Sequence, residues 1–353
     1  MQFIKPDTNV DFVGRRKLAF VVSVIVLLIG LGALFSRGDS LYGIDFAGGT
    51  IIQVRLDNPT TADKIKEGLK DIGLDRSAIQ GFGDQEKVFL IRTDTSVSEA
   101  GGLGEKVKES LEGVYGEDSV VVERVEMVGP KVGKDLRQKA LLAIYYALLF
   151  IAIYISGRFE LKWMPAVIMA GALILGVYTL RAVGVSTPVL IVAALVITLA
   201  CCWVLRLKYA LGAVIALIHD VMITMGAFAI ANKELNVSVV AALLTIIGYS
   251  LNDTIIVFDR IRENLRKARR RAFEEVVNTS INQTLSRAIL TTGTTLVVVT
   301  SLFILGGGVI HDFAFALIVG VVVGTYSSIF VASPVLIAWE ARFAKARVRT
   351  PAR

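Results

Sequence analysis

Cysteine and histidine are scarce in this chain, and their scarcity excludes several kinds of site. The 353 residues include two cysteines, Cys201 and Cys202, which are adjacent in an apolar run and so cannot build a disulfide framework. The two histidines are too few for a metal site, and no nucleophile and base can be paired from the residues present. These absences argue against an enzyme and predict no catalytic residue, no metal and no other cofactor.

Long hydrophobic runs, in contrast, are abundant. The composition is 54% hydrophobic and the mean hydropathy is +0.64, which a soluble domain of this length would not show. Runs of about 20 apolar residues can cross the hydrocarbon core of a membrane. Candidate runs begin near Leu18, Ala140, Met164, Val189, Ala210, Val237, Ala288 and Phe313. The first run is longer than a signal-peptide core and no small-residue cleavage site follows it, so we expect an uncleaved anchor. The sequence predicts a polytopic α-helical membrane protein with about eight spans.

Basic residues predict the orientation of these spans. An N-terminus on the inside places the following residues on the cytoplasmic side: Arg158, Lys162, Arg206, Lys208, Arg260, Arg262, Arg266, Lys267, Arg269, Arg270, Arg271, Arg342, Lys345, Arg347, Arg349 and Arg353. The short outer loops then hold only Arg181 and Lys233, as the positive-inside rule requires. The net charge of +7 therefore marks the cytoplasmic face. Because the basic stretch "RKARRRAF" lacks interleaved stacking aromatics, no nucleic-acid partner is expected.

One polar segment separates the first two spans. Its pattern predicts strands at "GGTIIQVRL", "SAIQGFG", "KVFLIRT" and "SVVVERVEMVG", with helices at "TTADKIKEGLKDIG" and "VSEAGGLGEKVKESLEGVYG". The order β-α-β-β-α-β is that of a ferredoxin-like α+β domain. The expected division is a cytoplasmic N-terminus (1–17), a first span (18–36), a periplasmic domain (37–137), a second span (138–157), a hairpin (163–207), a four-span bundle (209–338) with a basic cytoplasmic loop (259–287), and a cytoplasmic tail (339–353).

Five blocks of sequence resemble a known family. "YGIDFAGGT", "VEMVGPKVGKDLRQKA", "KYALGAVIALIHDV", "IGYSLNDTIIVFDRIRENLRK" and "INQTLSRAILTTGTTL" occur in the order found in the SecF family of bacterial protein-export subunits, within the resistance-nodulation-division superfamily. The first block holds the signature residues Gly43, Asp45, Phe46, Gly48, Gly49 and Thr50.

The resemblance implies a function and a set of partners. Members of this family work with SecD beside the SecYEG channel, after SecA has pushed the substrate in from the cytoplasm. They use the proton gradient to help draw unfolded, translocating protein across the bacterial inner membrane. The expected partners are therefore SecD, SecYEG, SecA acting upstream, the translocating chain and membrane lipids.

One segment departs from the family pattern. The usual sequence runs directly from "RFE-x-K" into "ALGAVIALIHD", whereas here about two spans' length of apolar sequence lies between them. An even number of added spans preserves the orientation of everything that follows. We therefore expect an extra helical hairpin, packed by default against lipid.

Asp253 is the least expected residue within a predicted span. A carboxylate in hydrocarbon costs about 3 kcal/mol or more, so intramembrane acids usually serve a function. Asp253 lies about 8 Å deep, at the depth that the stem of Arg287 would reach. The resemblance implies that this pair moves protons. Asn252, Ser250 and Thr254 supply donors and acceptors nearby, and a static ion pair between two helices is the alternative.

His219 and Asp220 form a second pair of polar residues within a span. They lie about 15 Å from the start of their span, near the midplane of the membrane. Histidine titrates near physiological pH, so the pair could relay protons. A hydrogen-bonded structural pair is an equal alternative.

Two other functions remain open on the sequence alone. Proton-driven efflux of small molecules occurs in the same superfamily, although such pumps usually have duplicated outer domains on a longer chain. A scaffold that holds SecD at the channel without transporting anything would not require Asp253 to titrate.

Overall fold

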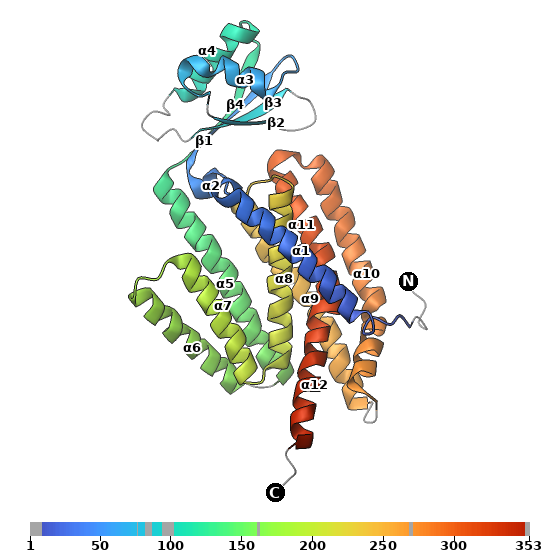
Figure 1. The fold of residues 1–353 in the computed structure, drawn as a ribbon. Helices are drawn as coiled ribbons and strands as arrows, with labels where there is room; N and C mark the ends of the chain where they lie inside the picture. Colours follow the sequence, from blue (N-terminus) through green and yellow to red (C-terminus); the bar gives the residue numbers. More distant parts are fainter. Residues whose placement is uncertain are drawn as a thin grey trace.

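The chain forms a bundle of long helices with a small α/β domain at one end (Figure 1). This computed structural model describes residues 9–75, 77–81, 87–93, 102–160, 163–267 and 271–349. Lys162, Arg269, Arg270 and Arg353, which contributed to the topology argument, lie outside these residues. The bundle comprises α1 (Arg16–Arg37), α5 (Pro130–Glu160), α6 (Trp163–Ala182), α7 (Thr187–Val204), α8 (Lys208–Ile230), α9 (Val237–Lys267), α10 (Phe273–Leu305), α11 (Gly307–Ser327), a π-helical turn (Ser328–Ala332) and α12 (Ser333–Arg349).

Within the described residues, seven helices are long and apolar enough to cross a membrane. The predicted polytopic helical architecture is therefore confirmed. The fourth predicted run, which begins near Val189, forms a shorter apolar helix, Val189–Val204, within α7. It ends at Val204, and two residues later Arg206 turns the backbone with a φ of +57°. About eight spans were expected, and this helix is the one that falls short of the length of the others.

The outer domain has the predicted ferredoxin-like topology. Its strands are β1 (Gly49–Leu56), β2 (Ala78–Gly81), β3 (Val88–Thr93) and β4 (Val120–Val128), in the antiparallel order β2-β3-β1-β4. Its helices, α3 (Ala62–Gly68) and α4 (Leu103–Tyr115), cover one face of the sheet (Figure 1). Strand β1 alternates as expected, because Ile52 and Val54 are fully buried beneath these helices while Arg55 is exposed.

Two signature glycines join the outer domain to the bundle. Gly48 and Gly49 have φ values of +82° and +118°, which side chains rarely tolerate. A Cβ on Gly48 would lie 2.9 Å from the Cα of Pro130, and one on Gly49 would lie 2.7 Å from the carbonyl oxygen of Thr93. Only glycine therefore fits where the chain passes from the short helix α2 (Ile44–Ala47) into β1.

Other residues of the same segment contact the loop between α8 and α9. The Gly43 amide donates to the Leu235 carbonyl at 2.8 Å, and the Asp45 carboxylate accepts from the Val237 amide at 2.9 Å. An ion pair of 2.6 Å between Arg92 of β3 and Glu234 reinforces this contact. The outer domain is thus tied directly to the turn that connects two bundle helices.

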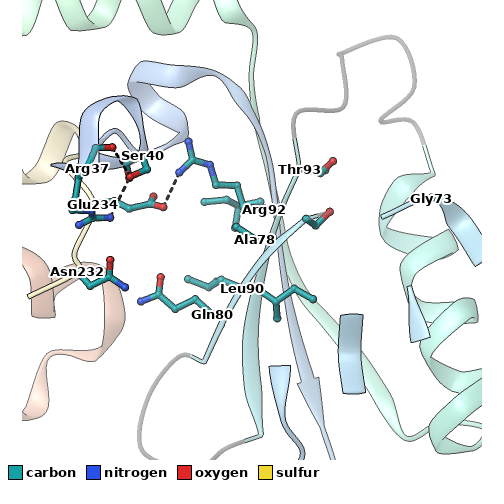
Figure 2. A pocket seen from close by; sticks show the side chains of 13 residues that line it. Arg37, Ser40, Gly73, Ala78, Gln80, Leu90, Arg92, Thr93, Asn232 and Glu234 are labelled. Carbon is teal, nitrogen blue, oxygen red and sulfur yellow. Dashed lines mark hydrogen bonds and ion pairs between the residues drawn. The ribbon is translucent and has the colours of Figure 1, made fainter. Parts of the chain in front are cut away.

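A cleft of about 830 Å³ lies between the open face of the sheet and the outer end of the bundle. Figure 2 shows Gln80, Leu90 and Arg92 on the sheet side, with Arg37 and Asn232 opposite. Its lining is mainly polar, and its two walls are joined by the Arg92–Glu234 ion pair.

Glycines allow two pairs of bundle helices to approach closely. Gly30 of α1 meets Gly226 of α8, where an added Cβ would lie 2.7–3.2 Å from the facing backbone. On α11, a Cβ on Gly320 would lie 2.3 Å from Ile246 of α9, and one on Gly324 would lie 2.9 Å from Ser250. Small residues at such interfaces let backbones pack closely, which membrane helices need because lipid offers no hydrophobic drive for association.

Candidate functional site

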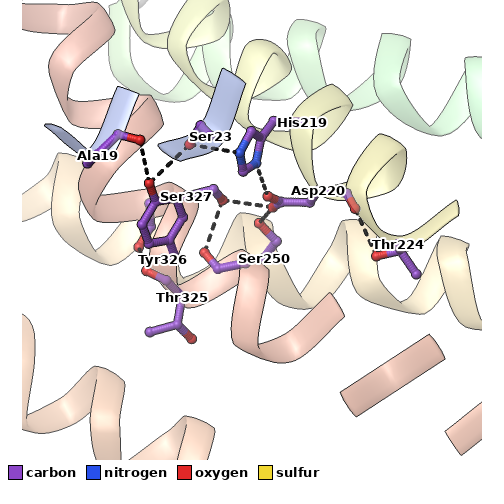
Figure 3. Close-up of polar contacts among 11 residues, drawn as sticks. Ala19, Ser23, His219, Asp220, Thr224, Ser250, Thr325, Tyr326 and Ser327 are labelled. Atoms are coloured by element: carbon purple, nitrogen blue, oxygen red, sulfur yellow. Dashed lines mark hydrogen bonds and ion pairs between the residues drawn. The ribbon is translucent and has the colours of Figure 1, made fainter. Parts of the chain in front are cut away.

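Asp220 on α8 is a buried carboxylate surrounded by donors. One of its oxygens accepts hydrogen bonds from Ser250 of α9 at 2.5 Å and from Ser327 of α11 at 2.8 Å. Its other oxygen lies 3.0 Å from Nδ1 of His219 (Figure 3). The side chain of Asp220 is 1% exposed, and no lysine or arginine within the described residues lies within 4 Å of it. Hydroxyl groups and one imidazole therefore stabilise this carboxylate in place of a cationic partner.

His219 extends this network to the first helix. Its Nε2 lies 3.2 Å from the hydroxyl of Ser23 on α1, and that hydroxyl lies 3.0 Å from the phenol of Tyr326 on α11. The phenol donates to the Ala19 carbonyl at 2.8 Å (Figure 3). The structure thus brings the predicted pair His219 and Asp220 together in a buried network that joins four helices.

Asp253 on α9 occupies a second buried polar site. It is 2% exposed and accepts a hydrogen bond from the Thr325 hydroxyl at 3.2 Å. The hydroxyl of Thr325 also lies 2.6 Å from that of Thr292 on α10. Threonine hydroxyls of α10 and α11 therefore lie beside Asp253, where the sequence predicted the side chain of Arg287.

Arg287 lies farther from Asp253 than the sequence suggested. It is exposed on α10, and its guanidinium nitrogens lie more than 4 Å from the Asp253 carboxylate. Asn252 is also exposed, because it lies on the opposite side of α9 from the buried face that carries Asp253. The direct contact expected from the depth match is absent because the side chain of Arg287 lies on the outer surface of α10.

The residues that link the two carboxylates were not predicted from the sequence. Thr325, Tyr326 and Ser327 are consecutive on α11, and they contact Asp253, the Ser23–His219 pair and Asp220, respectively. The π-helical turn begins at the next residue. Such turns occur often at functional sites. The signal available in the sequence was the run of four adjacent polar residues, "TYSS", within an apolar segment.

This arrangement suits proton binding better than other chemistry. A hydroxyl can donate to a carboxylate or, after rotation, accept from a carboxylic acid, so both protonation states can be hydrogen-bonded without moving the backbone. Within the described part of the chain, no three His, Cys, Asp or Glu side chains gather as a metal site would require.

The family signatures extend over most of the chain. Residues 42–60 match the family model described as the SecD/SecF GG motif. Residues 106–195 and 180–342 match the model described as protein export membrane protein SecD/SecF, C-terminal. The two matches overlap over residues 180–195, within the α6–α7 hairpin.

Relatives match along nearly their whole length. The chain is 38% identical over 335 residues to the protein translocase subunit SecF of Calditerrivibrio nitroreducens, covering 94% of this chain and 95% of that protein. It is 41% identical over 342 residues to SecF of Magnetococcus marinus, covering 96% and 94%. Its fold is similar to the crystal structure of SecDF, a translocon-associated membrane protein from Thermus thermophilus, with a TM-score of 0.70 and 29% identity. That match covers 95% of this chain and 39% of the longer SecDF chain. On this evidence, the chain is a multi-pass membrane protein that belongs to the SecF family of protein translocase subunits.

Proposed function

We propose that this protein is an auxiliary subunit of the Sec translocase that works with SecD and uses the proton gradient to assist protein export. It acts beside SecYEG, after SecA, on unfolded polypeptide that emerges on the outer side of the bacterial cytoplasmic membrane. It performs no covalent chemistry. Its termini and the basic loop 259–287 face the cytoplasm, which the distribution of lysine and arginine supports.

One observation carries the proton-coupled part of this proposal. Asp253 and Asp220 are both buried inside a membrane bundle, and both are held by hydroxyl groups. A permanently charged carboxylate would be better stabilised by a cation in direct contact, whereas a carboxylate that exchanges protons needs partners that serve both states. The hydroxyl-lined geometry therefore favours titration over a static ion pair.

The fold offers a route from these carboxylates to the outer domain. Protonation of Asp253 or Asp220 changes which hydrogen bonds Thr325 and Ser327 make, and both residues lie on α11 just before the π-helical turn. Asp220 lies on α8, whose outer end leads to the loop that binds the outer domain through Glu234. We infer that a change of packing among α8, α9 and α11 moves this loop and, with it, the outer domain.

Exposed polar residues on α9 and α10 support a docking face for SecD. Thr245, Gly248 and Asn252 recur on one exposed side of α9, and Arg287 and Thr294 are exposed on the adjacent α10. Polar groups facing lipid are costly, whereas a partner helix can hydrogen-bond with them. SecD bound here would cover these residues and would bring its own side chains close to Arg287.

The decisive experiment replaces Asp253 with asparagine, which keeps the shape but cannot carry a proton. Because no cation among the described residues contacts Asp253 directly, the Asp253→Asn variant should accumulate normally and bind SecD. It should nevertheless fail to support export driven by the proton gradient. The measurement is late-stage export into energised inverted vesicles, with and without an uncoupler.

Asp259→Asn is the matched control. It is the same substitution on the same helix, at a residue whose carboxylate is 46% exposed and pairs with Arg158. This variant should export normally. Uncoupler-sensitive export by a fully expressed Asp253→Asn variant would refute the proton-site proposal and leave the scaffold as the better description.

A further inference from the structure

A long apolar groove runs along the bundle between α1 and α12, with α8 as its floor. Its volume is about 780 Å³. Figure 1 shows α1 crossing the bundle obliquely in front of α8. The walls include Val21 and Leu27 of α1, Ile218 and Met222 of α8, and Val335 of α12, and the lining is overwhelmingly apolar.

One end of the groove is basic. Arg16 and Lys17 line it at the start of α1, at the end of the bundle away from the outer domain. Arg16 pairs with Glu274 at 2.8 Å. Lys17, which is exposed, makes no hydrogen bond or ion pair with any residue that the structure describes. Glu274 also lines this end but is paired with Arg16, so the ammonium group of Lys17 has no acidic partner among the described residues and lies beside the apolar part of the groove.

The dimensions of the groove indicate what fits it. From Arg16 to Leu31 the groove follows α1 for 16 residues, or about 22 Å along the helix axis. Extended hydrocarbon chains are narrower than a helix and suit an apolar channel of this length.

We propose that this groove binds an anionic phospholipid, with an acyl chain between α1, α8 and α12 and the phosphate on Lys17 and Arg16. The cation at the mouth and the apolar channel correspond to the headgroup and tail of one molecule. Because His219 and Ser23 also line the groove, a bound chain would cover the outer side of the His219–Ser23 contact and keep water from it. This inference does not depend on proton coupling or on SecD.

Photocrosslinking tests the site on the full chain. The protein is reconstituted into phosphatidylcholine vesicles that contain phosphatidylglycerol with a photoactivatable group in its acyl chain, and labelled peptides are mapped by mass spectrometry. We expect labels on the groove faces of α8 and α12, displaced by excess phosphatidylglycerol but not by phosphatidylcholine. In the Lys17→Gln variant, about five-fold more phosphatidylglycerol should be needed to displace the label, because one basic residue at a membrane surface contributes about this much to lipid affinity.

Two further variants separate binding from folding. Lys139→Gln removes an exposed lysine at the opposite end of the bundle and should leave labelling unchanged. Val21→Trp, at a residue that is 52% exposed and lines the groove, should fill the channel and abolish labelling in a protein that remains monodisperse. Labels spread evenly over lipid-facing helices such as α6, equal competition by phosphatidylcholine, or labelling insensitive to Lys17→Gln would each overturn the proposal. Crosslinking of the groove to a partner subunit in native membranes would overturn it as well.

Discussion

Gly324 of α11 faces Ser250 of α9 so closely that a Cβ on the glycine would lie 2.9 Å from the Cβ of the serine. Ser250 donates to a carboxylate oxygen of Asp220, and Ser327, three residues after Gly324, donates to the same oxygen. Gly324 and Ser250 therefore flank the Asp220 site. We predict that Gly324→Ala separates the two helices and lowers the free energy of unfolding by about 1–3 kcal/mol. Thermal unfolding in detergent measures this. Gly293→Ala, where an added Cβ meets nothing within 4 Å, should have no such effect; equal stability of both variants would contradict the packing argument.

Ser327→Ala should also destabilise the bundle. The substitution removes one of the donors to the buried Asp220 carboxylate and should cost about 1–3 kcal/mol, as for other hydrogen bonds to charged groups. The comparison is Ser301→Ala on α10, where an exposed serine bonds to the Val297 carbonyl of its own helix and to no other residue that the structure describes. If chemical denaturation showed the two variants to be equally stable, Ser327 would not be supporting the carboxylate.

Thr245→Trp should reduce copurification of SecD from membranes. The bulky ring would project from the exposed polar side of α9 that we assign to SecD, and it would block close helix contact. Val196→Trp on the lipid-facing side of α7, at a residue that is 60% exposed, is the control and should leave the yield of SecD unchanged. Loss of SecD with both variants, or with neither, would remove α9 as the docking face.

Glu234→Gln should loosen the outer domain from the bundle. Its ion pair with Arg92 is partly screened, with side chains 30% and 18% exposed, so we expect a loss of about 1 kcal/mol or less. Hydrogen exchange of the Gly43 and Leu235 amides, which bond across this junction, should quicken up to about five-fold. Glu123→Gln breaks the Arg55–Glu123 pair within the sheet and should not alter exchange at these amides. Equal rates in the wild type and the Glu234→Gln variant would show that the backbone contacts suffice.

Deletion of residues 164–205 should leave a protein that inserts into the membrane and binds SecD. The Tyr209 amide at the start of α8 donates to the Glu160 carboxylate at the end of α5 at 3.1 Å, so a short link can join the two helices. Stability should fall, because Trp203 packs on Trp339 of α12 with ring centroids 4.9 Å apart. Membrane fractionation and copurification measure the outcome. Complete loss of the shortened chain from the membrane would show that the hairpin is an integral part of the bundle.

The sequence alone determined the class of protein, the helices and the outer domain. These features follow from local patterns: apolar runs, the alternation in β1 and the glycine and proline signals at the ends of elements. The signature glycines could be identified in the sequence, although only the backbone angles at Gly48 and Gly49 explain why glycine is required there.

The identity of the groups around the buried acids was decided by the tertiary structure. Depth along a helix predicts that Asp253 and Arg287 lie at similar levels, but rotation about the helix axis, set by packing, turns Arg287 outward and brings Thr325 to the carboxylate. Likewise, Ser23 reaches His219 across 196 positions of sequence only because the facing glycines Gly30 and Gly226 let α1 and α8 cross closely. Local sequence patterns specify which residues a helix buries, whereas the partner that each buried polar group meets depends on how distant helices pack.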